Sequence, residues 1–160
     1  MNMEETLRYL DEKGVKYSLT EHKAVYSMDE LGSLSLPYPE LDAKNLFLRD
    51  DKKENYYLLT LKGEKRADLK KLRKIISSRP LSFASSDELL YFLKLTPGSV
   101  TPLGLFNDAK HEVVFLLDSF FSSSLIGVHP NDNRATVWLE SKDLVRLLTE
   151  RGNECIFVDI

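Results

Sequence analysis

The chain of 160 residues is long enough to bury about two-thirds of its unfolded surface, so a hydrophobic core alone can stabilise it. Its 42% hydrophobic and 29% charged residues are typical of a soluble globular protein. The formal net charge of −3 argues against wholesale nucleic-acid binding, which usually needs a strongly basic domain. No apolar run approaches the roughly 20 residues of a membrane helix.

The first residues, Met1–Glu5, are acidic where a signal peptide is basic and then apolar. Cys155 is the only cysteine, which excludes an internal disulfide and a cysteine-built metal site. We therefore expect a single domain over residues 1–160, located in the cytoplasm and without a membrane partner.

In chain order, caps, stops and apolar spacing predict helices at 3–13, from Ser27, at 68–76, from Ser85 and at 141–151. Apolar runs and alternation predict strands at 15–20, 42–50, 56–61, 82–84, 112–118, 125–128, 135–139 and 154–160. Residues 98–104 are predicted to form a loop. Because helices and strands are interspersed and one connection is a hairpin, we predict an α/β (α+β) fold. Its sheet is mixed, mostly antiparallel and surrounded by helices.

The strand predicted at 42–50 has a short apolar centre, Leu46-Phe47-Leu48, bounded by charged residues. Lys44 lies at the mouth of this strand. From spacing alone it is an ordinary strand-end lysine, because long charged side chains reach water easily. Two other segments make it a candidate for function, namely the glycine-proline loop at 98–105 and the Gly-Val-His-Pro-Asn turn at 127–131.

Glycines let a backbone approach a ligand closely, and their N–H groups can face a developing oxyanion. The loop at 98–105 could therefore bind a small carbonyl compound with an amine, although from these residues alone a plain helix-to-strand connection is the better explanation. It lacks the lysine of a phosphate loop, and no elbow motif supports a serine nucleophile. His22, His111 and His129 are scattered without a partner at ligand spacing, so we predict no metal site.

Basic residues are concentrated between Lys62 and Arg79, where Glu64 and Asp68 are the only acids. Such a segment suits either a solvated helix face or a polyanionic partner held at one end of the molecule.

Together these segments resemble the YbaK-like aminoacyl-tRNA deacylases, which are related to the editing domain of bacterial prolyl-tRNA synthetase. The resemblance runs over nearly the whole chain and is most specific at 43–48, 98–102 and 127–131. It is greatest for the ProX-type branch, which removes alanine from mischarged tRNA(Pro). The resemblance implies a mixed α/β fold, tRNA(Pro) charged with alanine as substrate, and no cofactor.

The resemblance also implies roles for particular residues. Lys44 is the expected catalytic residue, acting through its positive charge on the ester and on the tetrahedral oxyanion. The expected substrate-binding residues are Asn45, Gly98, Ser99, Val100, Thr101, Pro102, Gly127, His129 and Asn131. The basic residues expected to contact the tRNA are Lys62, Lys65, Arg66, Lys70, Lys71, Lys74 and Arg79.

The sequence leaves three alternatives open. The first is a deacylase of the same fold that prefers Cys-tRNA(Pro). The second is a non-catalytic module that binds tRNA or a synthetase, against which the intact Lys44 argues. The third is a small-molecule hydrolase or amino-acid-binding protein, against which the basic segment argues. We expect prolyl-tRNA synthetase as a further partner, no DNA partner, and a monomer.

Overall fold

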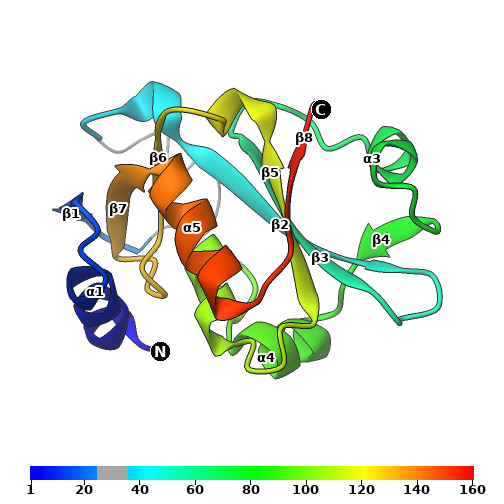
Figure 1. Cartoon of the computed structure of the whole chain (residues 1–160), viewed down its shortest axis with the longest axis horizontal. Helices are drawn as coiled ribbons and strands as arrows, with labels where there is room; N and C mark the ends of the chain where they lie inside the picture. The colour runs from blue at the N-terminus through cyan, green and yellow to red at the C-terminus, as the bar shows by residue number, and fades with distance from the viewer. Residues whose placement is uncertain (25–35) are drawn as a thin grey trace.

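The computed structural model describes residues 1–24 and 36–160, so the short helix expected from Ser27 lies outside the described residues. Within them, the strands form two sheets (Figure 1). The five-stranded sheet has the order β4-β2-β3-β5-β8, with β2 at Ala43–Asp50, β3 at Tyr56–Lys62, β4 at Leu81–Phe83, β5 at Val113–Asp118 and β8 at Cys155–Val158. The three-stranded sheet has the order β1-β7-β6, with β1 at Tyr17–Glu21, β6 at Leu125–Val128 and β7 at Ala135–Glu140.

The helices lie on both sides of the larger sheet. They are α1 (Met3–Glu12), α3 (Leu69–Ile76), α4 (Ser86–Leu93) and α5 (Ser141–Arg151), with 3-10 turns η1 (Pro39–Leu41), η2 (Pro102–Asn107) and η3 (Ser119–Phe121). Figure 1 shows α5 and the three-stranded sheet on one side of the five-stranded sheet and α3 on the other. Within the described ranges, no helix is both long and apolar enough to cross a membrane.

The strand pairing confirms the predicted α/β (α+β) class. β2 is antiparallel to β3 and β4, and β7 is antiparallel to β1 and β6, whereas β3-β5 and β5-β8 are parallel. The expected single sheet is instead two. Val137 and Leu139 of β7 are buried in the same core as Phe115 and Leu117 of β5. The smaller sheet therefore stacks on the larger one instead of extending it.

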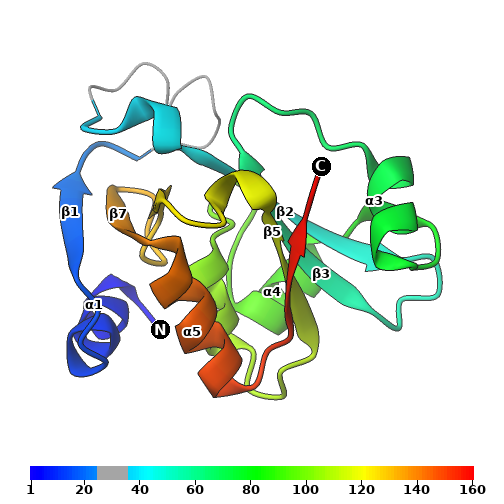
Figure 2. The ribbon, with the colours of Figure 1, turned by 45° about the horizontal axis from the view of Figure 1, so that its top comes forward.

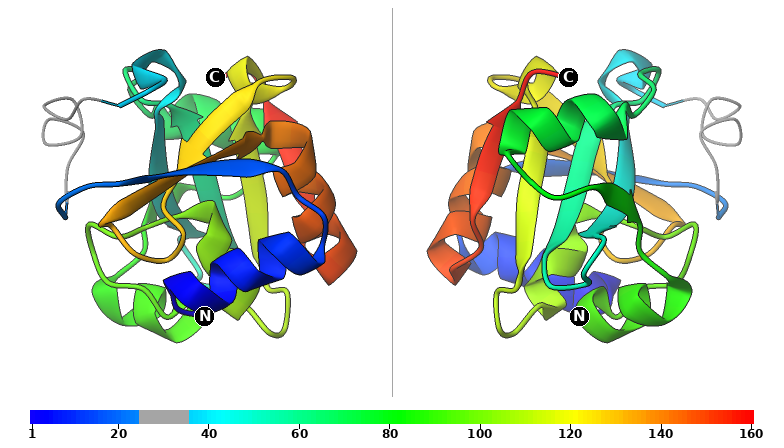
Figure 3. Two further views of the ribbon diagram at one scale, coloured as in Figure 1. Left: turned by 90° about the vertical axis from the view of Figure 1, so that its left-hand side faces the viewer. Right: turned by 90° about the vertical axis from the view of Figure 1, so that its right-hand side faces the viewer.

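β5 is buried on both faces, as its continuous apolar run predicted. Phe115 and Leu117 belong to the first core, and Leu116 points to the opposite face, where it packs in a second core with Leu72 of α3. The right-hand view in Figure 3 shows α3 lying across this second face. Figure 2 shows the C-terminus beside α3, in agreement with Ile160 packing against the second core.

Side-chain caps mark the first residues of α3 and α4, but not of α5. The carboxylate of Asp68 accepts a first-turn N–H of α3 at 3.1 Å, as predicted. Ser85 and Glu88 form the reciprocal capping box of α4. Ser141 was expected to cap α5, but it is the first residue of that helix, and its buried hydroxyl instead accepts the N–H of Ser124 at 3.3 Å.

In the part of the chain that the structure describes, one edge of β2 is paired only at its two ends. β4 pairs with residues 48–50, and Asp42, just before the strand, bridges to Gly127 of β6. Alternate residues of an antiparallel strand direct their backbone groups to opposite neighbours. The carbonyl of Phe47 accepts a bond from the β4 side, at 2.9 Å. The N–H of Asn45 therefore points to the same side, into the uncovered interval of the edge.

Candidate active site at the start of β2

Two hollows lie on opposite faces of the first residues of β2, because successive side chains of a strand point to opposite faces. The narrow hollow, about 20 Å³, is lined by Leu36, Asp42, Ala43, Asn45, Gly127, Val128, His129, Thr136 and Trp138. The open hollow, about 730 Å³, is lined by Lys44, Leu46, Arg66, Ala67, Asp68, Leu69, Lys70 and Phe83. A space of about 15 Å³ admits one water molecule, so the narrow hollow has room for a group of methyl size.

A glycine and a tryptophan set the width of the narrow hollow. Gly127 of β6 pairs directly with Trp138 of β7. A Cβ atom on residue 127 would lie 2.4 Å from Cζ3 of the Trp138 indole, closer than real atoms approach. The indole can therefore pack over the backbone only because residue 127 has no side chain.

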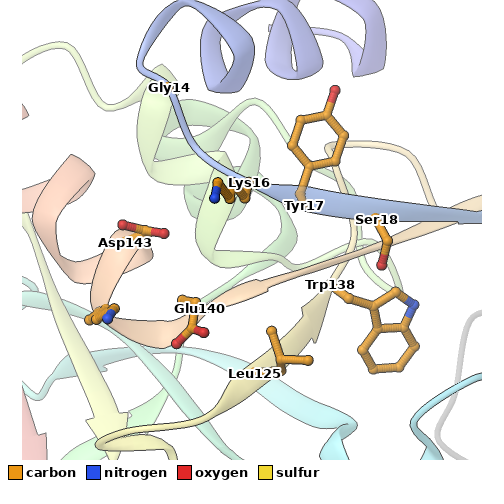
Figure 4. A pocket seen from close by; sticks show the side chains of 9 residues that line it. Gly14, Lys16, Tyr17, Ser18, Leu125, Trp138, Glu140 and Asp143 are labelled. Atoms are coloured by element: carbon orange, nitrogen blue, oxygen red, sulfur yellow. The ribbon is translucent and has the colours of Figure 1, made fainter.

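Trp138 separates the narrow hollow from a larger one, about 520 Å³, between β1 and the start of α5 (Figure 4). The indole lines both spaces, and its Nε1 donates to Oγ1 of Thr20 at 3.1 Å. The larger hollow carries charges of both signs, including Lys16 and Glu140. The anchored indole is thus a partition that keeps the narrow hollow small.

Asn45 presents an oriented amide to the narrow hollow. The buried hydroxyl of Thr60, its cross-strand neighbour, donates to Asn45 Oδ1 at 2.6 Å. The amide oxygen thereby has a partner, and among residues 1–24 and 36–160 no group accepts from the two N–H donors of Asn45, which can therefore serve a ligand. Together with its backbone N–H at the open edge of β2, Asn45 supplies donors of the kind that stabilise an oxyanion.

His129 supplies the complementary acceptor. Its Nδ1 lies 2.9 Å from the carbonyl of Ala135, and since a carbonyl only accepts, Nδ1 carries the proton. Burial lowers the pKa of the His129 imidazole below its usual range. The neighbouring His22 acts in the same direction, while the bond to Ala135 and the charge of Asp132 act against it. Neutral His129 therefore presents Nε2 as an acceptor for an N–H or O–H group.

Comparison with known proteins places this geometry in a family. The model of the aminoacyl-tRNA editing domain matches residues 22–147, which contain both hollows. The chain belongs to the aminoacyl-tRNA editing domain family. It is 42% identical over 145 residues to the prolyl-tRNA editing protein ProX of Acetoanaerobium sticklandii, covering 90% of this chain and 88% of that protein.

More distant relatives share the fold of this editing domain. The prolyl-tRNA synthetase associated domain-containing protein 1 of Mus musculus is 32% identical over 150 residues, covering 91% of this chain and 88% of the mouse protein. The solved structure of a "putative trans-editing enzyme for prolyl tRNA synthetase" superposes with a TM-score of 0.72 at 20% identity. That match covers 99% of this chain and 96% of the other, and at such identity it shows the fold alone.

Thr101 connects the glycine-proline loop to the turn that carries His129. The buried hydroxyl of Thr101 donates to the His129 carbonyl at 2.6 Å and so ties the loop to the turn. From Pro102 the chain is not a loop but the 3-10 turn η2, because proline is already preorganised for a first helical position. Gly98, Ser99 and Val100 do not line the narrow hollow, contrary to the expectation that the loop forms a wall of it.

Asn131, expected beside the aminoacyl group, does not line the narrow hollow and is held by bonds to other elements. Its backbone has a φ of 61°, and its amide nitrogen donates to Thr6 Oγ1 at 2.9 Å and to the Leu103 carbonyl at 3.2 Å. These bonds hold the turn against α1 and η2. The structure thus gives Asn131 a role in shaping the editing domain, because asparagine tolerates the left-handed conformation that this turn needs.

The structure divides the predicted basic segment in two. Lys62 was expected to contact the tRNA from the surface, but it is buried. Its Nζ lies 3.4 Å from Oδ1 of Asp42. Nζ of Lys65 lies 3.0 Å from Asp118, which is also buried, and Arg79 pairs with Asp51. The exposed cations on and beside α3 are Arg66, Lys70, Lys71, Arg73 and Lys74. Among the described residues, no carboxylate forms an ion pair with this second group, whereas Lys62, Lys65 and Arg79 are each paired with an aspartate.

Thr136 and Trp138 line the narrow hollow but were missed in the sequence. They lie two residues apart on β7, so they share the outward face of the smaller sheet, while Val137 points into the core. Alternation alone could have placed them on one face. Their position opposite Gly127 depends on the register between β6 and β7, which no local pattern encodes. In residues 1–24 and 36–160, no cluster of His, Cys, Asp or Glu could hold a metal ion.

Proposed function

We propose that this editing domain is a trans-acting deacylase that hydrolyses Ala-tRNA(Pro) to free alanine and tRNA(Pro). The observation that carries the proposal is the methyl-sized narrow hollow lined by Asn45, Gly127 and Trp138, with Lys44 next to Asn45 on the opposite face of β2. The 42% identical protein from Acetoanaerobium sticklandii is described as a prolyl-tRNA editing protein, which supports tRNA(Pro) as the nucleic acid.

Size discrimination explains why such a site is useful. A synthetase pocket shaped for proline cannot strongly reject something smaller, because a missing methylene is worth only about 1–3 kcal/mol. A second and smaller site that hydrolyses the undersized product restores accuracy. The Gly127 backbone and the Trp138 indole packed on it both line the narrow hollow, which has room for the alanine methyl group, whereas the proline ring needs space that the indole occupies.

The reaction joins the two hollows. The amino acid lies in the narrow hollow and its RNA lies in the open hollow. The ester that joins them therefore passes over the unpaired edge of β2, at Lys44 and Asn45. Water adds to the ester carbonyl, the acyl C–O bond breaks, and the ribose hydroxyl leaves with a proton. The positive charge of Lys44 and the N–H groups of Asn45 stabilise the oxyanion. The acceptor Nε2 of His129 holds the α-amino group, and the free ribose hydroxyl assists the attacking water.

We also propose the setting of the reaction. The chain acts as a monomer in the cytoplasm, where tRNA is charged. Prolyl-tRNA synthetase is its expected partner, because that enzyme makes the mischarged ester on which the domain acts.

A side-by-side deacylation assay on tRNA(Pro) charged with alanine, cysteine or serine tests the proposal. We expect alanine to be released fastest, because the cysteine sulfur adds an atom to a hollow of about 20 Å³. Faster release of cysteine would assign the chain to the alternative Cys-tRNA(Pro) deacylases of the same fold. No release of any amino acid, with the RNA still bound, would identify the chain as a non-catalytic binding module.

Acidification should slow the reaction. Neutral His129 accepts a bond from the substrate, and its protonated form cannot. Because burial holds its folded-state pKa below the unfolded value of about 6.5, the loss of rate should begin below that pH.

The stability of the fold should depend on pH through the same histidine. The unfolded chain binds more protons at His129 than the folded chain does in the same pH range. The contribution of His129 to the free energy of unfolding is therefore fully present above about pH 6.5 and is lost as the pH falls toward the folded-state pKa.

The rates of wild type, His129→Gln and His22→Gln are measured from about pH 5 to 8, each divided by the rate of uncatalysed hydrolysis at the same pH, because the division removes the intrinsic pH dependence of the ester. The acid limb should vanish in His129→Gln and persist in His22→Gln, whose ring lies 6.2 Å from that of His129. An acid limb unchanged in His129→Gln would show that His129 does not face the substrate.

The exposed cations of α3 should supply much of the affinity for tRNA. Neutralising Lys70, Lys71 and Lys74 together should weaken binding and flatten the slope of log Kd against log salt by roughly two to three, as release of about one counterion per contact predicts. The charge-matched control neutralises Lys52, Lys110 and Lys142, which are exposed on other elements. Equal effects of the two triple variants would reduce α3 to an ordinary solvated face.

A further inference from the structure

The open hollow combines positive charge with an exposed aromatic ring. Lys44, Arg66 and Lys70 lie around it, and Phe83 stands at its β4 side. Phe83 is 60% exposed, among the most exposed large apolar side chains of the described residues. Packing does not explain this exposure, because Leu48, which pairs with Phe83 across the sheet, is fully buried in the second core.

The charges of this hollow are not balanced from within. Among the described residues, the amines of Lys44 and Lys70 and the guanidinium of Arg66 lie within ion-pair distance of no carboxylate. Asp68 also lines the hollow, but its carboxylate is engaged as the cap of α3. The hollow therefore has a net positive charge over a floor that Leu46 makes partly apolar.

We propose that the open hollow is the docking surface for the unpaired 3′ end of the RNA, with Phe83 as a stacking platform for one of its bases. This rests on the proposed function, which puts the terminal ribose at Lys44. The nucleotides that precede it must leave the site along the same face of β2, where Leu46 and Phe83 follow Lys44. Aromatic rings between cations are how single-stranded nucleic acids are held, because bases stack while phosphates pair with the charges.

Charge and shape favour an RNA end over a peptide. A peptide strand would add to the free edge of β2 through backbone hydrogen bonds and would not need cations on both sides of the ring. A base has a flat face of about the size of the Phe83 ring. Its flanking phosphates can reach Arg66 and Lys70.

The test uses fluorescence anisotropy to compare binding of two acceptor-stem minihelices of tRNA(Pro) that carry no amino acid. One has the single-stranded CCA end and the other lacks it. Phe83→Ala should weaken binding of the CCA-bearing RNA by about tenfold, within the range for loss of one base-stacking contact, and leave binding of the truncated RNA unchanged. Phe83→Tyr should restore the affinity, because a tyrosine ring also stacks. A loss that is equal for the two RNAs would overturn the proposal.

The control is Phe157→Ala, because Phe157 is 45% exposed on β8, at the opposite edge of the same sheet. It should bind both RNAs like wild type. Deacylation assays separate this inference from the proposed function. If wild type releases alanine while Phe83→Ala keeps full preference for the CCA-bearing RNA, the stacking role alone is wrong. If wild type releases no amino acid, the proposed function itself is wrong.

Discussion

Replacing Lys44 with alanine should slow deacylation of Ala-tRNA(Pro) by about 10²–10³-fold, the cost of removing one oxyanion-stabilising group. The side chain lies at the start of β2 on the wall of the open hollow and contributes to neither core. The variant should therefore keep the wild-type free energy of unfolding. Single-turnover kinetics and chemical denaturation measure the two quantities on the same protein.

Two lysine controls sharpen this result. Lys44→Arg keeps the charge and should retain part of the rate, because guanidinium differs from ammonium in shape. Lys53→Ala, in the exposed turn between β2 and β3, should retain all of it. A folded Lys44→Ala protein that hydrolyses Ala-tRNA(Pro) at near the wild-type rate would remove Lys44 from the mechanism.

Gly127→Ala should be nearly inactive, with a loss of about 100-fold or more, because displacing catalytic groups by about 1 Å can have that effect. The new methyl group would either fill the narrow hollow or push the Trp138 indole, whose Cζ3 it would approach to 2.4 Å. Overpacking of this kind also destabilises by about 1–3 kcal/mol. Activity is measured at a temperature where denaturation curves show the variant to be folded.

The matched control is Gly104→Ala, which also crowds a buried contact. A Cβ there would lie 2.5 Å from Cδ1 of Leu95, and Gly104 does not line the narrow hollow. We expect this variant to lose stability while keeping its rate. Full activity in Gly127→Ala would show that the aminoacyl group binds elsewhere.

Much of the fold could be predicted because its signals are local. The capped start of α3 at Asp68, the stop of α5 at Gly152 and the apolar run of β5 each depend on neighbours in sequence. The division into two sheets could not be predicted, because it depends on which core accepts Val137 and Leu139. Long-range packing of this kind leaves no periodic trace.

The site shows the same division. Lys44 and Asn45 are adjacent on one predicted strand, so their alternate faces follow from the strand itself. Trp138 lines the narrow hollow only because of the register of β7 against Gly127, and Asn131 does not line it because the turn is tied to Thr6 of α1. Lys62 was expected on the surface with its neighbours, but β3 carries it to a buried position beside Asp42.

The most direct test of the central claim is single-turnover hydrolysis of Ala-tRNA(Pro) and Pro-tRNA(Pro) by the wild-type protein under the same conditions. The narrow hollow bounded by Gly127 and Trp138 should admit alanine and exclude the proline ring. We expect alanine to be released about 100-fold faster than proline or more, at the upper end of what pocket size alone can discriminate. Equal release of the two amino acids would contradict the account.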